Sequence, residues 1–183
     1  MIIERDELVV KMIDDIMERE GWPLYTNRAA DRGGPTKGGI TLKTLAEWRG
    51  HKVTPAELMQ LSEAEAKTIY HQRYLRPWEF IPHDGLFQAC VDYAVTSWHD
   101  DPTYALQGIV GVEQDGRLGP LTRRAVLLYP DPEFLRRRVL AHRIKKMVDL
   151  ALNDSKLQAL IRWHDDLQIR NLRGWINRVT DQF

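Results

Sequence analysis

The chain has 183 residues, enough for one domain with a small appended subdomain at most and for a sizeable core. Lysine plus arginine and aspartate plus glutamate number 26 each, so the balanced charge argues against nucleic acid as a partner. The single cysteine, Cys90, excludes an intramolecular disulfide framework, and its place in an apolar helical stretch predicts core packing.

The N-terminal region carries charges where a secretory signal needs apolar side chains, and no apolar run reaches the length of a membrane span. We therefore expect a protein that is made in the cytosol and stays there until something else releases it.

Apolar residues at helical spacing predict an amphipathic helix over about residues 4–20. It ends at Glu20-Gly21, and Pro23 prevents its continuation. The next twenty residues or so, to Thr41, are rich in Gly, Pro, Asn, Asp and Thr. A long irregular segment in a compact domain is typical of a binding or catalytic loop, and its glycines permit positive φ and the close approach of a ligand.

The rest of the chain is predicted to be helical. The expected helices begin after a Thr41 cap and at about residue 55, and then span about 63–76, 86–98, 104–110, 121–129, 133–152 and 155–179. The stretch 86–98 is apolar on most faces, which predicts a buried central helix. Only the glycine-rich loop could hold a short hairpin, so the sequence indicates a mainly α fold.

Five segments stand out in order along the chain. They are EGW at 20–22, DRGGPTKGGIT at 31–41, YLRPW at 74–78, QACVDYAVTS at 88–97 and DGRLGPLT at 115–122. Together they resemble the bacteriophage endolysins and related muramidases of glycoside hydrolase family 108, and the last matches a motif shared with peptidoglycan-binding modules. The resemblance extends over about residues 5–178.

The resemblance implies a compact lysozyme-like helical domain with a glycine-rich active-site loop or short hairpin. It implies a muramidase region over 5–98 and a C-terminal helical peptidoglycan-binding-like region over 99–183, packed into the same globule. The expected function is that of a monomeric endolysin that hydrolyses the β-1,4 bond between N-acetylmuramic acid and N-acetylglucosamine in peptidoglycan and so lyses the host cell. Such an enzyme waits in the host cytoplasm until a holin-type permeabilisation admits it to the wall.

Two other functions remain open. A lytic transglycosylase needs only one acid, whereas a non-catalytic peptidoglycan-binding or secretion-accessory protein would keep the fold and the motif at 115–122 without turnover.

Glu20 is the expected general acid. Cleavage of a glycoside near neutral pH needs a carboxyl group that keeps its proton, and partial burial against Trp22 and Tyr25 would raise its pKa. A glutamate at a helix end is also typical of a solvated charged cluster, and Glu18 is the second choice for the acid.

Asp31 is the expected second carboxylate, which could orient a water molecule, stabilise the transition state or act as nucleophile. An Asp before Arg-Gly-Gly is also a common turn former. Thr36 is the preferred hydroxyl partner for the attacking water, and Thr41 is expected either to bind substrate or to cap the next helix.

Aromatic side chains can stack on sugar rings, and Trp22, Tyr25 and Trp98 are the expected cleft residues. Most other aromatics in the chain fall on helical stripes that are also typical of a core.

A basic amphipathic helix is expected over 133–150. It could contact an anionic envelope surface or simply dock one face on the core. The six histidines show no paired ligand spacing and no HExxH motif is present, so we expect neither a metal nor a cofactor.

Overall fold

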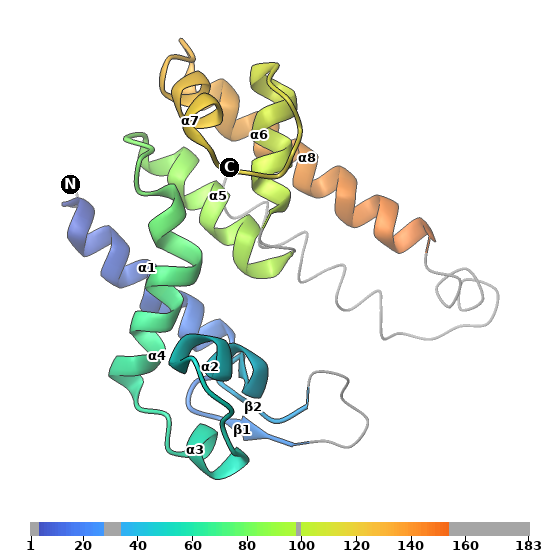
Figure 1. Cartoon of the computed structure of the whole chain (residues 1–183). Coiled ribbons are helices and arrows are strands. Elements are labelled where there is room, and N and C mark those ends of the chain that lie inside the picture. Colours follow the sequence, from blue (N-terminus) through green and yellow to red (C-terminus); the bar gives the residue numbers. More distant parts are fainter. Residues whose placement is uncertain (1–3, 28–33, 98–99, 154–183) are drawn as a thin grey trace. The chain divides into compact units, whose positions relative to one another are not determined.

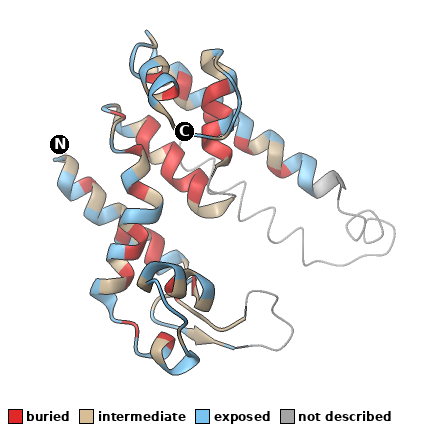
Figure 2. Ribbon diagram, in the orientation of Figure 1, coloured by how far each residue is buried: buried red, intermediate tan, exposed pale blue. Residues whose placement is uncertain are grey.

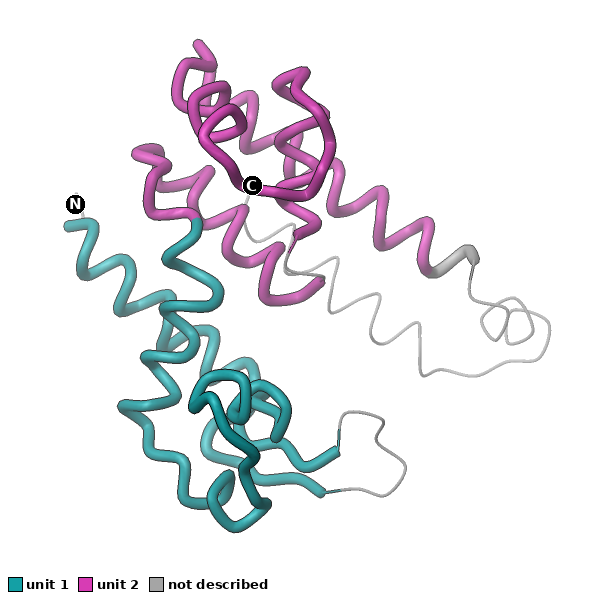
Figure 3. Tube along the Cα trace, viewed as in Figure 1, with its two compact units in different colours: residues 1–77 teal, residues 78–183 magenta. Residues whose placement is uncertain are grey.

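The computed structural model describes residues 4–27, 34–97 and 100–153 (Figure 1). The chain divides into two compact units, residues 1–77 and 78–183, each of which is described by itself (Figure 3). Within the described residues, no helix is both long enough and apolar enough to cross a membrane.

The first unit begins with α1 (Arg5–Arg19), which confirms the expected opening helix. Its buried residues, Leu8, Ile13, Ile16 and Met17, recur at helical spacing and form one apolar face that contacts α4 (Glu63–Tyr70). The helix ends at Glu20, and Gly21 follows with a φ of 76°. This positive φ reverses the chain direction and leads it into the glycine-rich segment.

Three short strands form an antiparallel sheet in the order β1-β2-β3. They are β1 (Tyr25–Thr26), β2 (Thr36–Lys37) and β3 (Ile40–Thr41). Gly38 and Gly39 join β2 to β3, and both have positive φ values, of 48° and 76°. Two-residue hairpin turns require such angles, which glycine adopts without a steric penalty. The expected hairpin is confirmed, and β1 adds a strand that the sequence pattern did not predict.

Side-chain caps start the following helices where the sequence predicts them. Thr41 caps α2 (Leu42–Arg49), Ser62 caps α4, and Thr54 forms a full capping box with Glu57 at α3 (Pro55–Met59). Each of these short helices has buried residues (Figure 2). Leu45 of α2 and Leu58 of α3 are fully inaccessible to solvent.

The helix expected over 63–76 is wrong in its second half. The α-helix ends at Tyr70, a π-helical segment η1 (His71–Leu75) follows, and the 3-10 helix η2 (Arg76–Trp78) contains Pro77. A π turn holds one more residue than an α turn, so it changes the direction in which successive side chains point.

The second unit contains four helices among its described residues: α5 (Asp84–Thr96), α6 (Asp101–Val110), α7 (Pro120–Leu127) and α8 (Pro132–Asn153). As expected, α5 is a buried central helix, and it contacts both α6 and α8. Polar groups also join these helices: the fully buried Arg143 of α8 pairs with Asp92 of α5 and donates to Thr96 Oγ1 at 2.8 Å. Burial of a charge requires such partners. The helix expected over 155–179 lies outside the described residues.

Candidate functional site

Glu20 lies at the C-terminal end of α1, half-buried against the β2–β3 turn. A Cβ atom at residue 39 would lie 2.5 Å from Tyr70 Oη and 2.8 Å from Glu20 Oε2. A side chain at this position would displace Tyr70 or Glu20. The absence of a side chain at Gly39 therefore allows the Glu20 carboxylate and the Tyr70 phenol to approach the hairpin backbone.

Tyr70 fixes the turn next to Glu20. Its hydroxyl donates to the Gly38 carbonyl at 2.8 Å, and its ring lies 5.6 Å from that of Tyr74. Burial raises the pKa of the Tyr70 phenol well above its ordinary value, and the Glu20 carboxylate adds to this shift. Tyr70 therefore remains a hydrogen-bond donor across the physiological pH range.

Neither Tyr70 nor Tyr74 was selected as a site residue from the sequence. Aromatic residues at i, i+4 spacing are also typical of a helix core, and Tyr70 is indeed buried. Its contact with Gly38 joins positions 32 residues apart, which local periodicity cannot reveal. Gly39 offered the only usable signal, because a positive-φ glycine often marks a close approach.

Trp22 packs against the other side of the same turn. A Cβ atom at Gly38 would lie 2.6 Å from Trp22 Cε3, and Lys37 Nζ lies 5.0 Å from the Trp22 ring centroid. Lys37 also donates to the Met59 and Leu61 carbonyls, at 2.6 and 2.8 Å. Trp22 therefore supports the hairpin. Its side chain is half-exposed, and its predicted contact with a sugar stays a prediction.

The three strands place a row of threonines on one face of the sheet. Thr26 pairs with Thr36, and Thr36 pairs with Thr41, so their side chains share that face. Tyr25 pairs with Lys37 and therefore belongs to the opposite face. All three threonines are half-buried.

The hydroxyl groups of Thr36 and Thr41 make different hydrogen bonds. Thr41 Oγ1 accepts from Thr44 N at 3.1 Å, which confirms the alternative that it caps α2. Thr36 Oγ1 donates to the Gly34 carbonyl at 3.1 Å, which leaves its oxygen lone pairs as acceptors. Of the two, Thr36 retains the greater capacity to hold a water molecule.

The remaining predicted site residues either lie outside the described part of the chain or differ in their exposure to solvent. Asp31 and Trp98 lie outside the described residues. Glu18, the alternative acid, is exposed, whereas Glu20 is half-buried at the hairpin turn. Within the described residues, no group of histidine, cysteine, aspartate or glutamate side chains could hold a metal ion. Burial raises the pKa of the Cys90 thiol, as expected for a core residue.

The motif at 115–122 is organised around the buried Gln107 of α6. Gln107 Nε2 donates to Asp115 Oδ1 at 2.7 Å and to Thr122 Oγ1 at 3.1 Å, and its Oε1 accepts from Gly116 N at 3.0 Å. A side chain at Gly116 would collide with Tyr104. The polar residues of this motif therefore hold the loop before α7 in its conformation.

Several cations of the basic helix form ion pairs with carboxylates of the same chain. Arg136 pairs with Glu133, Arg143 with Asp92, Lys145 with Asp149 and Lys146 with Asp101. Arg137 and Arg138 are exposed on α8. The basic surface is therefore smaller than the sequence suggests.

Comparisons with known proteins relate both parts of the chain to described families. Residues 13–97 match the family described as Glycosyl hydrolase 108, and residues 101–180 match the one described as Predicted Peptidoglycan domain. The chain is similar to the solved structure of Brucella abortus SagA, with 27% identity, a TM-score of 0.69, and coverage of 97% of this chain and 92% of that chain. The search of curated proteins found no match. The match to the glycosyl hydrolase 108 family over residues 13–97, followed by the peptidoglycan domain, indicates a glycosidase that acts on peptidoglycan.

Proposed function

We propose that the chain is an endolysin that hydrolyses the β-1,4 bond between N-acetylmuramic acid and N-acetylglucosamine, with Glu20 as general acid. The observation that supports this role most directly is the position of Glu20. Its half-buried carboxylate lies against Gly39, beside the Tyr70 phenol. A carboxyl group in such a place is partly shielded from water and fixed in orientation, as a proton donor must be.

In this mechanism Glu20 protonates the oxygen of the departing sugar. Asp31 stabilises the positive charge that develops on the ring being cleaved, and Thr36 orients the attacking water molecule. Thr36 shares its face of the sheet with Thr41, and the Glu20 carboxylate lies against Gly39 in the turn between them. The loop would supply Asp31 and Thr36, and the end of α1 would supply the acid. Trp22, Tyr25 and Trp98 would contact the glycan.

The endolysin role includes a route to the substrate. The enzyme would accumulate as a monomer in the host cytoplasm and reach the wall after holin-type permeabilisation. The domain at 101–180 supports peptidoglycan as the binding partner, and exposed cations on α8 would add attraction to an anionic envelope.

A matched pair of variants tests the general acid. Glu20→Gln keeps the shape of the side chain but removes its proton, so we expect clearing of outer-membrane-permeabilised cells to slow by at least about a hundredfold. Glu18→Gln changes an exposed carboxylate two residues earlier and should retain wild-type activity. Equal clearing by the two variants would exclude Glu20 as the acid.

The mass of the products identifies the reaction. Hydrolysis adds a water molecule across the cleaved bond, whereas a lytic transglycosylase leaves an anhydro end that is lighter by one water. Mass spectrometry of the released fragments should show the hydrated ends. If wild-type protein binds sacculi and releases no fragments, the non-catalytic function is the correct one.

A further inference from the structure

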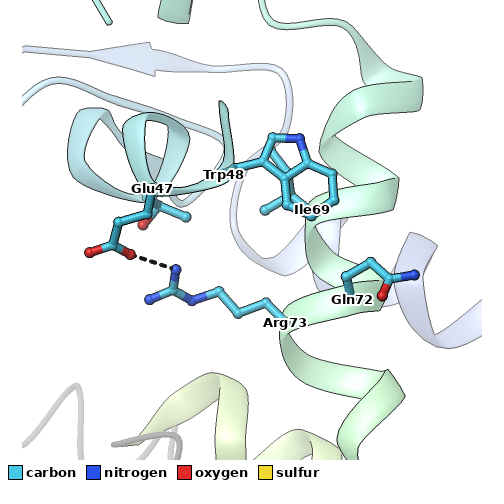
Figure 4. A pocket seen from close by; sticks show the side chains of 6 residues that line it. Glu47, Trp48, Ile69, Gln72 and Arg73 are labelled. Carbon is cyan, nitrogen blue, oxygen red and sulfur yellow. Dashed lines mark hydrogen bonds and ion pairs between the residues drawn. The ribbon is translucent and has the colours of Figure 1, made fainter. Parts of the chain in front are cut away.

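A concave feature of the first unit lies between α2 and the segment formed by α4 and η1. It is a pocket of about 240 Å3 (Figure 4). Its lining comprises Thr44, Glu47, Trp48, Ile69, Gln72 and Arg73. The proposed mechanism gives none of these residues a role.

One wall of the pocket is aromatic. Trp48 is 42% exposed, although it lines the pocket together with Ile69, which is buried (Figure 4). A tryptophan that only filled the core would be covered. An accessible indole in a concave surface offers a flat apolar face, which complements the apolar C–H face of a sugar ring.

The pocket also carries a charged pair. Arg73 Nη1 donates to Glu47 Oε2 at 3.0 Å, and the two side chains point toward each other in Figure 4. Their side chains are 41% and 47% exposed, so both groups reach solvent. Lys43 Nζ lies 3.9 Å from Glu47 Oε1, which leaves this cluster with two cations and one anion. A guanidinium has five donors in a planar fork, so Arg73 can bind a ligand carboxylate while it remains beside Glu47.

Two adjacent residues of η1 relate this pocket to Glu20, the candidate acid. Arg73 and Tyr74 are adjacent residues in the π-helical segment, and π turns occur frequently at functional sites. Burial raises the pKa of the Tyr74 phenol; the Arg73 guanidinium opposes this shift and the Glu20 carboxylate adds to it. The phenol of Tyr74 is thus an electrostatic neighbour of both Arg73 and Glu20.

We propose that this pocket is a subsite for a carboxylate-bearing saccharide unit of peptidoglycan, with the Trp48 indole stacked on the sugar and Arg73 bound to the carboxylate. The inference rests on the proposed function, because it takes peptidoglycan as the substrate. Peptidoglycan carries the required chemistry: stem peptides with free carboxylates are attached to its muramyl sugars. Chitin oligosaccharides contain the N-acetylglucosamine ring and lack these carboxylates.

Calorimetric titration of the full chain tests the subsite. The Glu20→Gln variant serves as the background, so the ligands stay intact, and the probes are a muropeptide tetrasaccharide and chitotetraose. We expect Arg73→Gln to weaken muropeptide binding about tenfold and to leave chitotetraose binding unchanged. Arg73→Lys should recover part of the loss, because it keeps the charge but not the planar fork.

Trp48→Ala should weaken the binding of both ligands about tenfold, and Trp48→Leu should do the same while it retains apolar volume. Lys11→Gln removes an exposed cation of α1 outside the pocket and should change neither affinity.

The outcomes are distinct. The subsite is excluded if both Trp48 variants bind the two ligands as tightly as the background protein does, and carboxylate recognition is excluded if Arg73→Gln affects both ligands alike. The proposed function is judged separately by fragment release from sacculi with Glu20 intact. Fragment release without the expected affinity pattern would overturn only the subsite, and the pattern without fragment release would overturn only the hydrolase.

Discussion

At the scale of single residues, the site depends on a position that has no side chain. Glycines in the loop indicated close approach of a ligand, and the structure shows that the Glu20 carboxylate and the Tyr70 phenol approach Gly39. The type of residue at this position was therefore informative from the sequence. The identity of the approaching groups was not, because Tyr70 lies more than thirty residues away along the chain.

Under the proposed function, Gly39→Ala should lower the activity by displacing Glu20. The new methyl group would collide with Tyr70 Oη and Glu20 Oε2, and the φ of 76° would itself cost an alanine about 1–2 kcal/mol. We expect a large fall in kcat together with reduced stability, measured by turbidity clearing and thermal unfolding.

Gly50→Ala is the matched control. Gly50 has a φ of 72°, and a Cβ atom there would have no heavy atom within 4 Å. The variant carries the same backbone strain without the collision, so it should lose about 1–2 kcal/mol of stability and keep its activity. Equal activity losses in the two variants would show that strain alone is responsible.

Buried phenols predict a loss of stability in alkali. The pKa of Tyr70 is raised in the folded protein from an ordinary value of 10.0, so above about pH 10 the unfolded chain releases a proton that the folded chain retains. The contribution is complete below pH 10 and is lost as the pH rises toward the folded pKa. Tyr93 behaves in the same way.

Tyr70→Phe should therefore flatten the fall in stability above pH 10, as measured by urea unfolding across a pH series. At neutral pH the variant loses the hydrogen bond to the Gly38 carbonyl and should be less stable by about 1 kcal/mol. An unchanged alkaline slope would contradict the burial of this phenol.

At the scale of elements, prediction succeeded where the determining chemistry is local. Thr41, Thr54 and Ser62 marked helix starts correctly, because a cap acts on the backbone only two or three residues away. The strand β1 was missed, because two residues contain no periodicity, and its pairing with β2 is made across the loop. The π turn was missed because one extra residue hardly disturbs an apolar stripe.

Gln107→Leu tests the loop at 115–122. The substitution removes hydrogen bonds to Asp115, Gly116 and Thr122 from a buried position, so we expect a loss of about 2–3 kcal/mol in the free energy of unfolding. Gln114→Leu, at an exposed position next to the loop, should change stability by less than about 0.5 kcal/mol. Denaturant titration distinguishes the two results. Equal losses would show that Gln107 does not organise the loop.

At the scale of the whole molecule, the proposed attraction to an anionic envelope depends on exposed charge. Arg137 and Arg138 are exposed on α8, so replacement of both by glutamate should weaken adsorption to purified sacculi at low salt. The difference should shrink at high salt, where charges are screened. The double variant Lys11→Glu/Arg124→Glu makes the same change in net charge at exposed positions on α1 and α7, so it is the control. Unaltered adsorption of the double variant would exclude α8 as an envelope contact.

The division of the chain into regions was predicted from motifs alone. The two family matches meet between residues 97 and 101, whereas the compact units meet between 77 and 78. Motifs follow ancestry along the chain, and packing follows apolar faces in space. The predicted division near residue 98 stays a prediction.

The helix α5 illustrates what this offset means in practice. It lies inside the stretch that matches the hydrolase family, yet it packs against α6 and α8, which lie outside that stretch. A truncated protein that stopped at residue 97 would lack both α6 and α8, so apolar surface of α5 would be exposed and the protein would be prone to aggregate. Anyone who wishes to exchange the wall-binding half for another should therefore move α5 together with it and make the junction before residue 84.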